Sequence, residues 1–377
     1  MGLEPEVFYK QLQANDILFF TGVPDSILKD FCSYVANNTK SENNIIAANE
    51  GNAIALAAGY YLSTNKIPLV YMQNSGLGNA INPLLSLVHK SVYKIPMLLL
   101  IGWRGAPGES DECQHIKQGS ITLDLLNLMD IPYSILTKDK YQSEEIVKKA
   151  SDYIKNNCTP YAIVVKKGIF SSYKFDQSTN NEFELSREEA IKIIISQLEE
   201  DDIVVSSTGN ISREVYEIRN QFKQTHERDF LMVGSMGHAS QIAMTIAMQK
   251  TDRDVYCLEG DGALIMHLGG LTTIGQKNVN NFRHIILNNG AHDSVGGQPT
   301  VGLNIQFEQL CMGVGYKGYL KAETRAELIY CLEKLKTNQG PLLLEVRVKK
   351  GARKDLGRPK IDSLERKKQF MKFLDKR

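Results

Sequence analysis

The sequence lacks the features of exported, membrane-spanning and disulfide-stabilised proteins. Its first residues contain no basic stretch followed by an apolar one, and no run approaches the roughly 18 apolar residues of a membrane span. The longest apolar run, Ile95 to Ile101, has the length of a strand. Six cysteines are scattered without a Cys-x-x-Cys pair, which argues against a zinc site or a disulfide scaffold. We therefore expect a cytoplasmic protein.

Strong charge and the common nucleotide fingerprints are also missing. The formal net charge of +1 argues against a general nucleic-acid binder. Neither glycine-rich stretch is a dinucleotide fingerprint, because the third glycine is replaced by Ile265 in one and by Ile81 in the other. A Gly-Lys-Ser/Thr phosphate loop is absent as well. These absences argue against nicotinamide and P-loop nucleotide sites.

What the sequence does contain is a repeated alternation of short apolar strands and helical patterns over 377 residues. This pattern predicts an α/β fold of two doubly wound domains, each a parallel sheet with helices on both faces. The predicted strands are Ile17 to Thr21, Asn44 to Ala48, Ile67 to Met72, Met97 to Ile101, Ala162 to Val165, Ile203 to Ser206, Phe230 to Val233, Val255 to Leu258, Ile285 to Leu287 and Leu342 to Val348. A polar stretch separates the two series, so we expect domains at 1–174 and 186–377 joined by a linker at 175–185.

Helical patterns fill the intervals between these strands. The predicted helices are Pro5 to Gln13, one from about Ser26, Gly51 to Leu62, Ser186 to Leu198, Ser212 to Asn220, Ala239 to Met248, Ala263 to Gln276 and Thr324 to Thr337. The helix after the linker begins with Ser186 and carries Glu189 three residues later, which is a capping box. No third domain is expected between the halves.

Two strand ends in the second half carry the most specific pattern. Gly260-Asp261-Gly262 follows one apolar strand, and Asn288-Asn289 ends another, with Asn289 lying 28 residues after Asp261. A carboxylate, an amide oxygen and the free N–H groups of a helix start suit Mg²⁺ shared with a diphosphate. An isolated Gly-Asp-Gly can also be a simple strand-to-helix turn.

This two-part motif resembles that of the thiamine-diphosphate enzymes, which begins with Gly-Asp-Gly and closes with Asn-Asn. The resemblance implies that Asp261, Asn289 and the backbone carbonyl of Ala291 ligate Mg²⁺. A second segment, Val233 to Ala239, is similar to the one that supplies a backbone carbonyl and a bulky apolar side chain to the cofactor. The cofactor-binding residues implied in this way are Gly234, Met236, Gly260, Asp261, Gly262, Ala263 and Asn289.

Glu50 is the candidate for the catalytic carboxyl group. It follows an apolar strand and begins a helix of small residues, where a carboxylate could also serve only to favour the helix dipole. The segment Asn49 to Tyr60 resembles the catalytic glutamate segment of the family, whose carboxyl group contacts the aminopyrimidine of the cofactor. In that family the cofactor lies between the pyrimidine-binding half of one subunit and the diphosphate-binding half of another. The resemblance therefore implies a homo-oligomer, at least a dimer, with active sites at subunit interfaces.

Polar strand ends elsewhere in the chain sharpen the resemblance. The stretches Thr21 to Ser26, Arg104 to Lys117 and Asn288 to Thr300 resemble the phosphonopyruvate decarboxylase family and, less closely, sulfopyruvate decarboxylases. This implies conversion of 3-phosphonopyruvate to phosphonoacetaldehyde and CO₂, within phosphonate metabolism leading to 2-aminoethylphosphonate. The residues we expect to bind the small anionic 2-oxo acid are Arg104, Lys117, Asp293, Ser294 and Gln298.

Two further residues are candidates for proton transfer. His115 and Asp25 lie in these polar stretches and can relay protons to the substrate, although His115 can equally be a structural loop residue. Arg104 offers a bidentate fork and Lys117 a point charge to the substrate, while either can be an ordinary surface cation.

Three alternatives stay open at this stage. The chain can act on sulfopyruvate, can be a related 2-oxo acid carboligase, or can bind thiamine diphosphate without turnover. A basic segment at 349–360 is either a solvated charge run or a cover that closes over the anionic substrate through Arg353 and Arg358.

Overall fold

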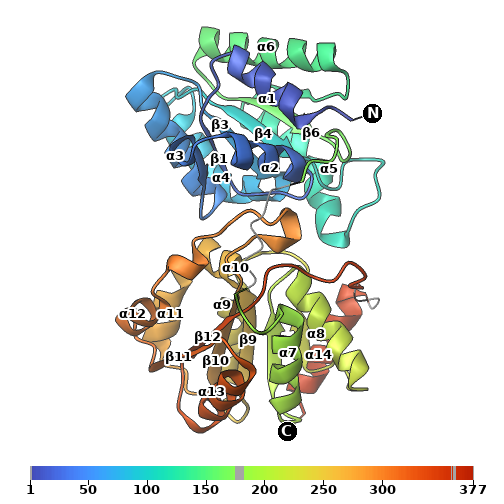
Figure 1. Cartoon of the computed structure of the whole chain (residues 1–377), viewed down its shortest axis with the longest axis vertical. Helices are drawn as coiled ribbons and strands as arrows, with labels where there is room; N and C mark the ends of the chain where they lie inside the picture. Colours follow the sequence, from blue (N-terminus) through green and yellow to red (C-terminus); the bar gives the residue numbers. More distant parts are fainter. Residues whose placement is uncertain (1, 175–181, 358, 360–361, 377) are drawn as a thin grey trace. The chain divides into compact units, whose positions relative to one another are not determined.

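The computed structural model describes residues 2–174, 182–357, 359 and 362–376. The chain divides into two compact units, Met1–Gln177 with Ser294–Gln298, and Ser178–Asp293 with Pro299–Arg377. Each unit has its own sheet (Figure 1). Each also has its own hydrophobic clusters. The predicted linker residues 175–181 lie outside the described part of the chain, as do residues 358 and 360 of the basic segment and residue 361, which follows it.

The N-terminal unit is built on a parallel sheet that, within the described residues, has six strands in the order β2-β1-β3-β4-β6-β5. The strands are β1 (Phe20–Gly22), β2 (Asn44–Ile46), β3 (Leu69–Gln73), β4 (Leu98–Gly102), β5 (Tyr133–Ile135) and β6 (Tyr161–Val165). The helices are α1 (Pro5–Ala14), α2 (Lys29–Asn38), α3 (Glu50–Thr64), α4 (Leu77–Pro83), α5 (Cys113–Leu128) and α6 (Lys140–Asn157).

Both faces of this sheet are covered, and its central strands are apolar at nearly every position. On β3, Leu69 and Tyr71 join a cluster with residues of α1, α2 and α6, while Val70 and Met72 join a cluster with residues of α3, α4 and α5. Alternate residues of a strand point to opposite faces, so a continuous apolar run is what a doubly covered sheet requires. The predicted doubly wound architecture is confirmed.

The C-terminal unit repeats this arrangement. Its sheet, over the described residues, has six parallel strands in the order β11-β12-β10-β9-β7-β8. The strands are β7 (Ile203–Ser206), β8 (Asp229–Leu231), β9 (Val255–Gly260), β10 (Phe282–Asn288), β11 (Gly318–Ala322) and β12 (Leu342–Arg347). The helices are α7 (Arg187–Gln197), α8 (Asn210–Gln221), α9 (Ala239–Gln249), α10 (Asp261–Met266), α11 (Gly270–Lys277), α12 (Phe307–Val314), α13 (Arg325–Thr337) and α14 (Ser363–Leu374).

The structure differs from the predicted elements in several respects. The helix predicted from Ala263 to Gln276 is two helices, α10 and α11, and the break at residues 267–269 ends with Gly269, which is followed by a second glycine at 270. The edge strands β5 and β11 and the helices α4, α5, α6, α12 and α14 were not predicted. The helix start at Ser186 is confirmed, because its side chain accepts the N–H of Glu189 and the Glu189 carboxylate accepts the N–H of Ser186.

The parallel sheets explain why distant polar residues come together. The carboxyl ends of parallel strands lie along one edge of a sheet, and ligands bind there in doubly wound folds. Asp25, Glu50 and Arg104 follow β1, β2 and β4 in the N-terminal unit. Asp261 and Asn289 follow the neighbouring strands β9 and β10 in the C-terminal unit.

Candidate active site

Asp261 is the buried carboxylate of the C-terminal unit. It is the first residue of α10 and is 2% exposed. Burial raises its pKa to about 6, although the hydroxyl of Thr300 and the backbone N–H groups of Asn289 and Gly262 donate to it and favour the charged form. A carboxylate held in this way gains stability from a cation. The donor set therefore fits a divalent metal ion.

The two asparagines after Leu287 have different partners. The Asn288 amide nitrogen donates to the carbonyl of Gly302 at 3.0 Å and to Glu345 Oε1 at 2.8 Å, so this side chain is fixed within the unit. The Asn289 Oδ1 accepts the N–H of Ala291 at 3.0 Å. Since the register pairs Leu287 with Gly260, Asn289 lies beside Asp261, as their spacing predicted.

The loop after β8 lies against the start of α10. A Cβ atom at Gly262 would lie 3.5 Å from Met236 Cε and 2.9 Å from the His292 ring, so this glycine leaves room for both side chains. Gly237 has φ 85° and packs against His267, which turns the loop toward α10. Met236 therefore lies beside Gly262, in agreement with the predicted grouping of the two segments.

Glu50 is the buried carboxyl group of the N-terminal unit. It is the first residue of α3, is 5% exposed and accepts the Asn79 amide at Oε2 over 2.8 Å. Its Oε1 lies so close to Gly76 that a side chain there would overlap it. Asn79 was not predicted, because a contact between α3 and α4 leaves no signature in the local sequence of either helix.

Asp25 is completely buried at the carboxyl end of β1. The N–H groups of Ile27 and Leu28 donate to Oδ2 at 2.9 and 3.2 Å, and Gln73 donates to Oδ1 at 2.6 Å. Burial raises its pKa, while the hydrogen bonds and Arg104 oppose the increase. Asp25 can therefore hold a proton at a higher pH than an exposed aspartate.

Arg104 is held in place by neighbouring side chains. Its Nε donates to Asp111 Oδ2 at 2.7 Å, its Nη2 contacts Asp111 Oδ1, and its Nη1 donates to Ser26 Oγ at 2.9 Å. The hydrogen bond to Asp111 raises the pKa of Arg104 and lowers that of Asp111. The fork that was predicted to hold an anion is thus fixed by a carboxylate.

Helix α5 begins close to this pair. Burial and the charge of Arg104 lower the pKa of His115, which favours the neutral imidazole at neutral pH. Its Nδ1 is buried and, among the described residues, has no hydrogen-bond partner. Lys117 lies one turn away from Cys113 on the same helix and is exposed.

The predicted substrate residues at 293–298 do not share one environment. Asp293 accepts the Asn289 amide and the Arg187 guanidinium, and Arg187 was not predicted as a site residue. Ser294 is exposed. Gln298 is 1% exposed and its Nε2 donates to Ser33 Oγ at 3.3 Å, within the N-terminal unit.

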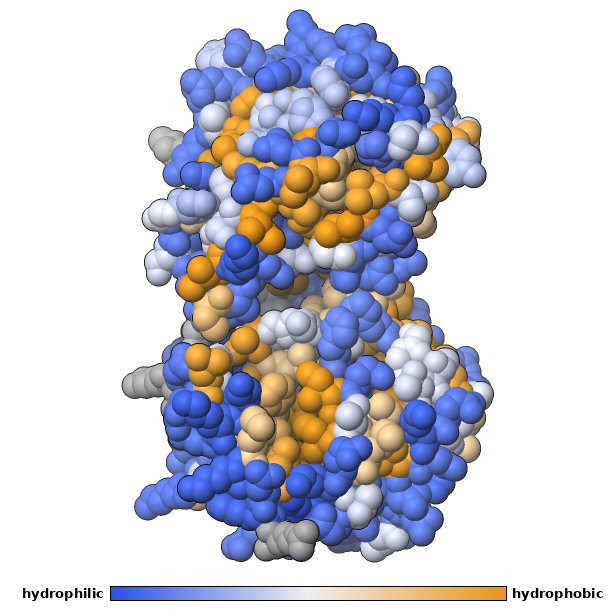
Figure 2. Space-filling view, turned by 180° about the vertical axis from the view of Figure 1, so that it is seen from behind, coloured by the Kyte–Doolittle hydropathy of each residue, from blue (hydrophilic) through white to orange (hydrophobic). Residues whose placement is uncertain are grey.

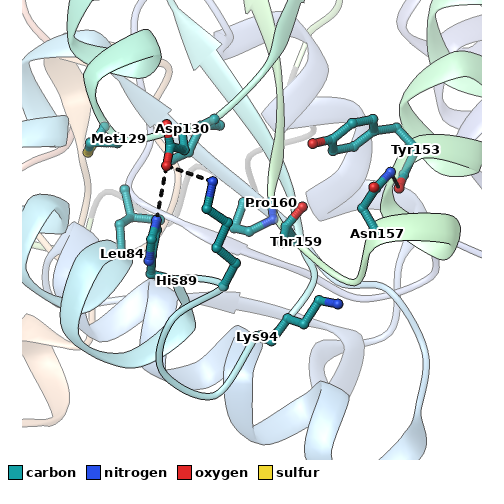
Figure 3. Close-up of a pocket in the computed structure, with 11 residues that line it drawn as sticks. Leu84, His89, Lys94, Met129, Asp130, Tyr153, Asn157, Thr159 and Pro160 are labelled. Atoms are coloured by element: carbon teal, nitrogen blue, oxygen red, sulfur yellow. Dashed lines mark hydrogen bonds and ion pairs between the residues drawn. The ribbon is translucent and has the colours of Figure 1, made fainter.

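A separate pocket lies in the N-terminal unit, away from these residues (Figure 3). It has a volume of about 460 Å³ and is lined by residues of the turns that precede β4, β5 and β6. Lys90 and Asp130 form an ion pair of 2.8 Å at its wall. Because this is the amino edge of the strands, the pocket is not part of the candidate active site.

The basic segment near the C-terminus is tied to its own unit where the structure describes it. Arg353 Nε donates to Glu188 at 3.0 Å, and its guanidinium also pairs with Glu217 and Asp355. Its charge is therefore shared among carboxylates of α7, α8 and the segment itself. In the described part of the chain, no helix is both long and apolar enough to span a membrane.

Comparison with known proteins agrees with this geometry. Residues 5–127 match the family described as thiamine pyrophosphate enzyme, N-terminal TPP binding domain, and residues 207–346 match its C-terminal TPP binding domain. The chain is 31% identical to a phosphonopyruvate decarboxylase of Streptomyces viridochromogenes, over 94% of this chain and 90% of that one. It is also 31% identical to a phosphonopyruvate decarboxylase of Streptomyces hygroscopicus, over 93% of this chain and 89% of that one.

A more distant relative carries a different name. A sulfopyruvate decarboxylase of Methanosarcina acetivorans is 28% identical over 80% of this chain and 81% of its own length. The two matched domains occur in the order expected from the sequence, and each match spans most strands of one described sheet. The chain belongs to the phosphonopyruvate decarboxylase family of thiamine pyrophosphate enzymes.

Proposed function

We propose that the protein decarboxylates 3-phosphonopyruvate to phosphonoacetaldehyde and CO₂, with thiamine diphosphate and Mg²⁺ as cofactors. The observation that carries this proposal is the nearly full-length match to two phosphonopyruvate decarboxylases, in a chain whose buried Asp261 and Asn289 end neighbouring strands. The reaction is a carbon–carbon lyase step, and we expect it to take place in the cytoplasm.

Mg²⁺ would be held by the Asp261 carboxylate, the Asn289 side-chain oxygen and the carbonyl of Ala291. The raised pKa of Asp261 supports this assignment, because a cation would compensate for the burial of its charge. All three groups are hard oxygen ligands, which Mg²⁺ prefers. The first turn of α10, with Gly260, Gly262 and Ala263, would take the diphosphate.

Thiamine diphosphate, when bound, supplies the electron sink that the loss of CO₂ from a 2-oxo acid requires. The residues that would contact its thiamine part are Gly234, Met236 and Glu50. Glu50 would hold and release a proton at its carboxylate against the aminopyrimidine ring. Its burial, with one carboxylate oxygen fixed by Asn79, supports this role because the carboxyl group is held in one orientation.

The substrate's negative charges would be bound by Arg104 and Lys117, with Ser294 and Gln298 as further polar contacts. Arg104 is fixed by Asp111 and Ser26, which favours a defined direction for its remaining N–H groups. His115 and Asp25 are the proposed proton-transfer residues, supported by their pKa shifts in opposite directions. Asp293 instead contacts Asn289 and Arg187.

We also propose that the protein is a homo-oligomer in which each active site takes Glu50 from one subunit and Asp261 from another. Helix α3, which begins with Glu50, exposes Ala55, Leu56 and Leu62, with 36% and 71% of the two leucines accessible. Apolar side chains also gather on the surface of each unit in Figure 2. An apolar face on a helix next to the catalytic carboxyl group supports association there.

The test is CO₂ release from 3-phosphonopyruvate, with Mg²⁺ and thiamine diphosphate each omitted in turn, and with sulfopyruvate and pyruvate run beside it. Fastest release from the phosphonate, dependent on both cofactors, is the expected result. Sulfopyruvate is the second candidate because a relative with that name matches 80% of the chain. Higher kcat/KM for sulfopyruvate would overturn the proposed substrate, and condensation with a second keto acid instead of aldehyde release would indicate a carboligase.

A further inference from the structure

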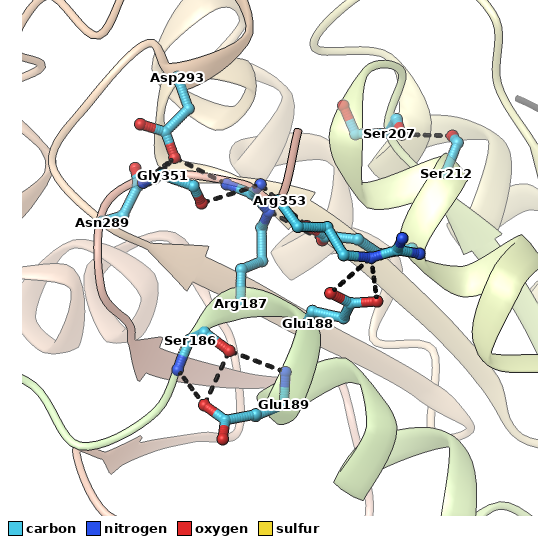
Figure 4. Close-up of polar contacts among 11 residues, drawn as sticks. Ser186, Arg187, Glu188, Glu189, Ser207, Ser212, Asn289, Asp293, Gly351 and Arg353 are labelled. Atoms are coloured by element: carbon cyan, nitrogen blue, oxygen red, sulfur yellow. Dashed lines mark hydrogen bonds and ion pairs between the residues drawn. The ribbon is translucent and has the colours of Figure 1, made fainter. Parts of the chain in front are cut away.

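One oxygen atom of Asp293 connects three parts of the C-terminal unit (Figure 4). Its Oδ2 accepts the Asn289 amide at 2.6 Å, the Arg187 Nη1 at 2.9 Å and the backbone N–H of Gly351 at 2.9 Å. These donors come from the loop after β10, the start of α7 and the segment after β12. The carboxylate of Asp293 is 8% exposed.

Arg187 is in turn fixed from its other side. Its Nε and Nη2 donate to the two oxygens of Glu214 at 2.9 and 3.0 Å, and the two side chains are 6% and 2% exposed. A bidentate pair of this kind sets both the position and the plane of the guanidinium group. Arg187 therefore presents Nη1 to Asp293 in one defined direction.

This arrangement determines how the Asn289 amide is oriented. An ionised carboxylate only accepts hydrogen bonds, so the amide must turn its nitrogen toward Asp293 and its oxygen away from it. The oxygen then faces the N–H of Ala291, whose carbonyl is the other proposed neutral ligand of Mg²⁺. An amide without this partner could rotate and present nitrogen, which does not bind a cation.

We propose that Arg187 and Asp293 are positioning residues that orient the Asn289 oxygen for Mg²⁺. This inference rests on the proposed function, because it assumes that Asn289 is a ligand. It assigns to Asp293 a contact with Asn289 in place of the contact with substrate expected from the sequence. Through Gly351, the first residues of the basic segment support the same carboxylate.

The test compares Arg187→Met and Asp293→Asn with a matched control, Arg219→Met, in the full-length protein. Arg219 forms a bidentate pair with Asp229 in the same unit, and both side chains are completely buried. The Kd for Mg²⁺ is measured by calorimetry with saturating thiamine diphosphate, beside the melting temperature and kcat at saturating Mg²⁺.

We expect Arg187→Met and Asp293→Asn to raise the Kd for Mg²⁺ about 10- to 100-fold, as loss of a ligand's supporting partner does elsewhere. Arg187→Lys keeps the charge and should recover part of the affinity for Mg²⁺. The kcat of this variant at saturating Mg²⁺ should differ from that of the wild type by less than about 3-fold. Arg219→Met should lower the melting temperature and leave the Kd unchanged. Two results would overturn the proposal. In the first, Arg187→Met and Arg219→Met affect Mg²⁺ binding equally. In the second, Arg187→Lys and Asp293→Asn leave the Kd for Mg²⁺ unchanged.

The experiment measures binding of Mg²⁺ and not turnover. The positioning role of Arg187 and Asp293 and the proposed function can therefore fail independently. Wild-type protein that binds Mg²⁺ and thiamine diphosphate but does not release CO₂ from 3-phosphonopyruvate would refute the proposed substrate and leave the positioning test readable. Wild-type protein that binds thiamine diphosphate but shows no binding of Mg²⁺ would refute the role of Asn289 as a ligand, and with it the role of Arg187.

Discussion

The two units share a strand order but use it for different chemistry. Counted from the first strand of each unit, both described sheets follow the order 2-1-3-4-6-5. The second strand leads to Glu50 in the N-terminal unit and to the loop with Met236 in the C-terminal unit. The third leads to Gln73 and Asn74 in one, and to Asp261 in the other. The sheet determines where ligands can bind, and the residues after each strand determine which chemistry occurs there.

The largest expected effect tests the residue at the second strand of the N-terminal unit. Glu50→Gln should lower the rate of CO₂ release about 100- to 10,000-fold, because an amide cannot take up and release the proton. Thiamine diphosphate affinity, measured by calorimetry, should stay within a few-fold of wild type. An active Glu50→Gln enzyme would contradict the catalytic role of Glu50. The residues after the second strand of each unit, Glu50 and Met236, would then no longer differ in this respect.

The next effect concerns the third strand of the C-terminal unit. Asp261→Asn should weaken Mg²⁺ binding by more than about 100-fold, since loss of a charged ligand exceeds the loss of a supporting contact. Titration of Mg²⁺ against the variant, with thiamine diphosphate present, gives the affinity. The matched control is Asp202→Asn, which changes another buried aspartate of the same unit whose pKa burial also raises to about 6. Unchanged Mg²⁺ affinity in Asp261→Asn would place the metal elsewhere.

A smaller effect tests which unit binds the substrate's charge. Arg104→Lys keeps the charge but loses the fork, so KM for 3-phosphonopyruvate should rise about 10- to 100-fold. Arg353→Ala is the comparison in the C-terminal unit, where Glu188, Glu217 and Asp355 already occupy the guanidinium group. We expect the KM of Arg353→Ala for 3-phosphonopyruvate to be unchanged. A similar rise in KM for both variants would support a basic cover over the substrate.

The smallest functional effect is expected at Asp202, which precedes β7, whereas Asp25 follows the equivalent strand β1. Burial raises the pKa of Asp202 to about 6, above its value in the unfolded chain. The protonated form is then favoured by folding, so this residue's contribution to stability is lost as pH rises from about 4 to about 6. The free energy of unfolding of Asp202→Asn should exceed that of the wild type by up to about 3 kcal/mol above pH 6 and should equal it below pH 4. Its kcat should be unchanged. Melting curves of both proteins across this pH range decide it.

The strands that carry the site could be predicted because each is an apolar run with a polar or glycine-rich end. β5 and β11 could not, because Ser134 interrupts β5 and Lys321 interrupts β11, so neither strand is a continuous apolar run. The pairing of Asp261 with Asn289 followed from strand order and motif spacing. The contacts of Asn79, Thr300 and Arg187 depend on packing between segments distant in sequence, and no local pattern encodes such packing.

Arg187 illustrates this limit. Its sequence neighbours predicted a helix start, and α7 begins there with a capping box. Nothing in Ser186 to Glu189 indicates that the side chain reaches Glu214 on another helix or Asp293 on the loop after β10. A buried arginine has to be paired, but its partners can be identified only once the fold is known.

The position of Glu50 at the first residue of α3 has a genetic consequence if the site is shared between subunits. A mixture of Glu50→Gln and Asp261→Asn chains would then form hybrid dimers in which one site carries both defects and the other carries none. Random exchange of subunits should restore about a quarter of wild-type activity from two inactive proteins, because half of the dimers are hybrids with one intact site. Two defective alleles in one cell would complement each other, whereas a site completed within a single chain would leave such a cell without activity.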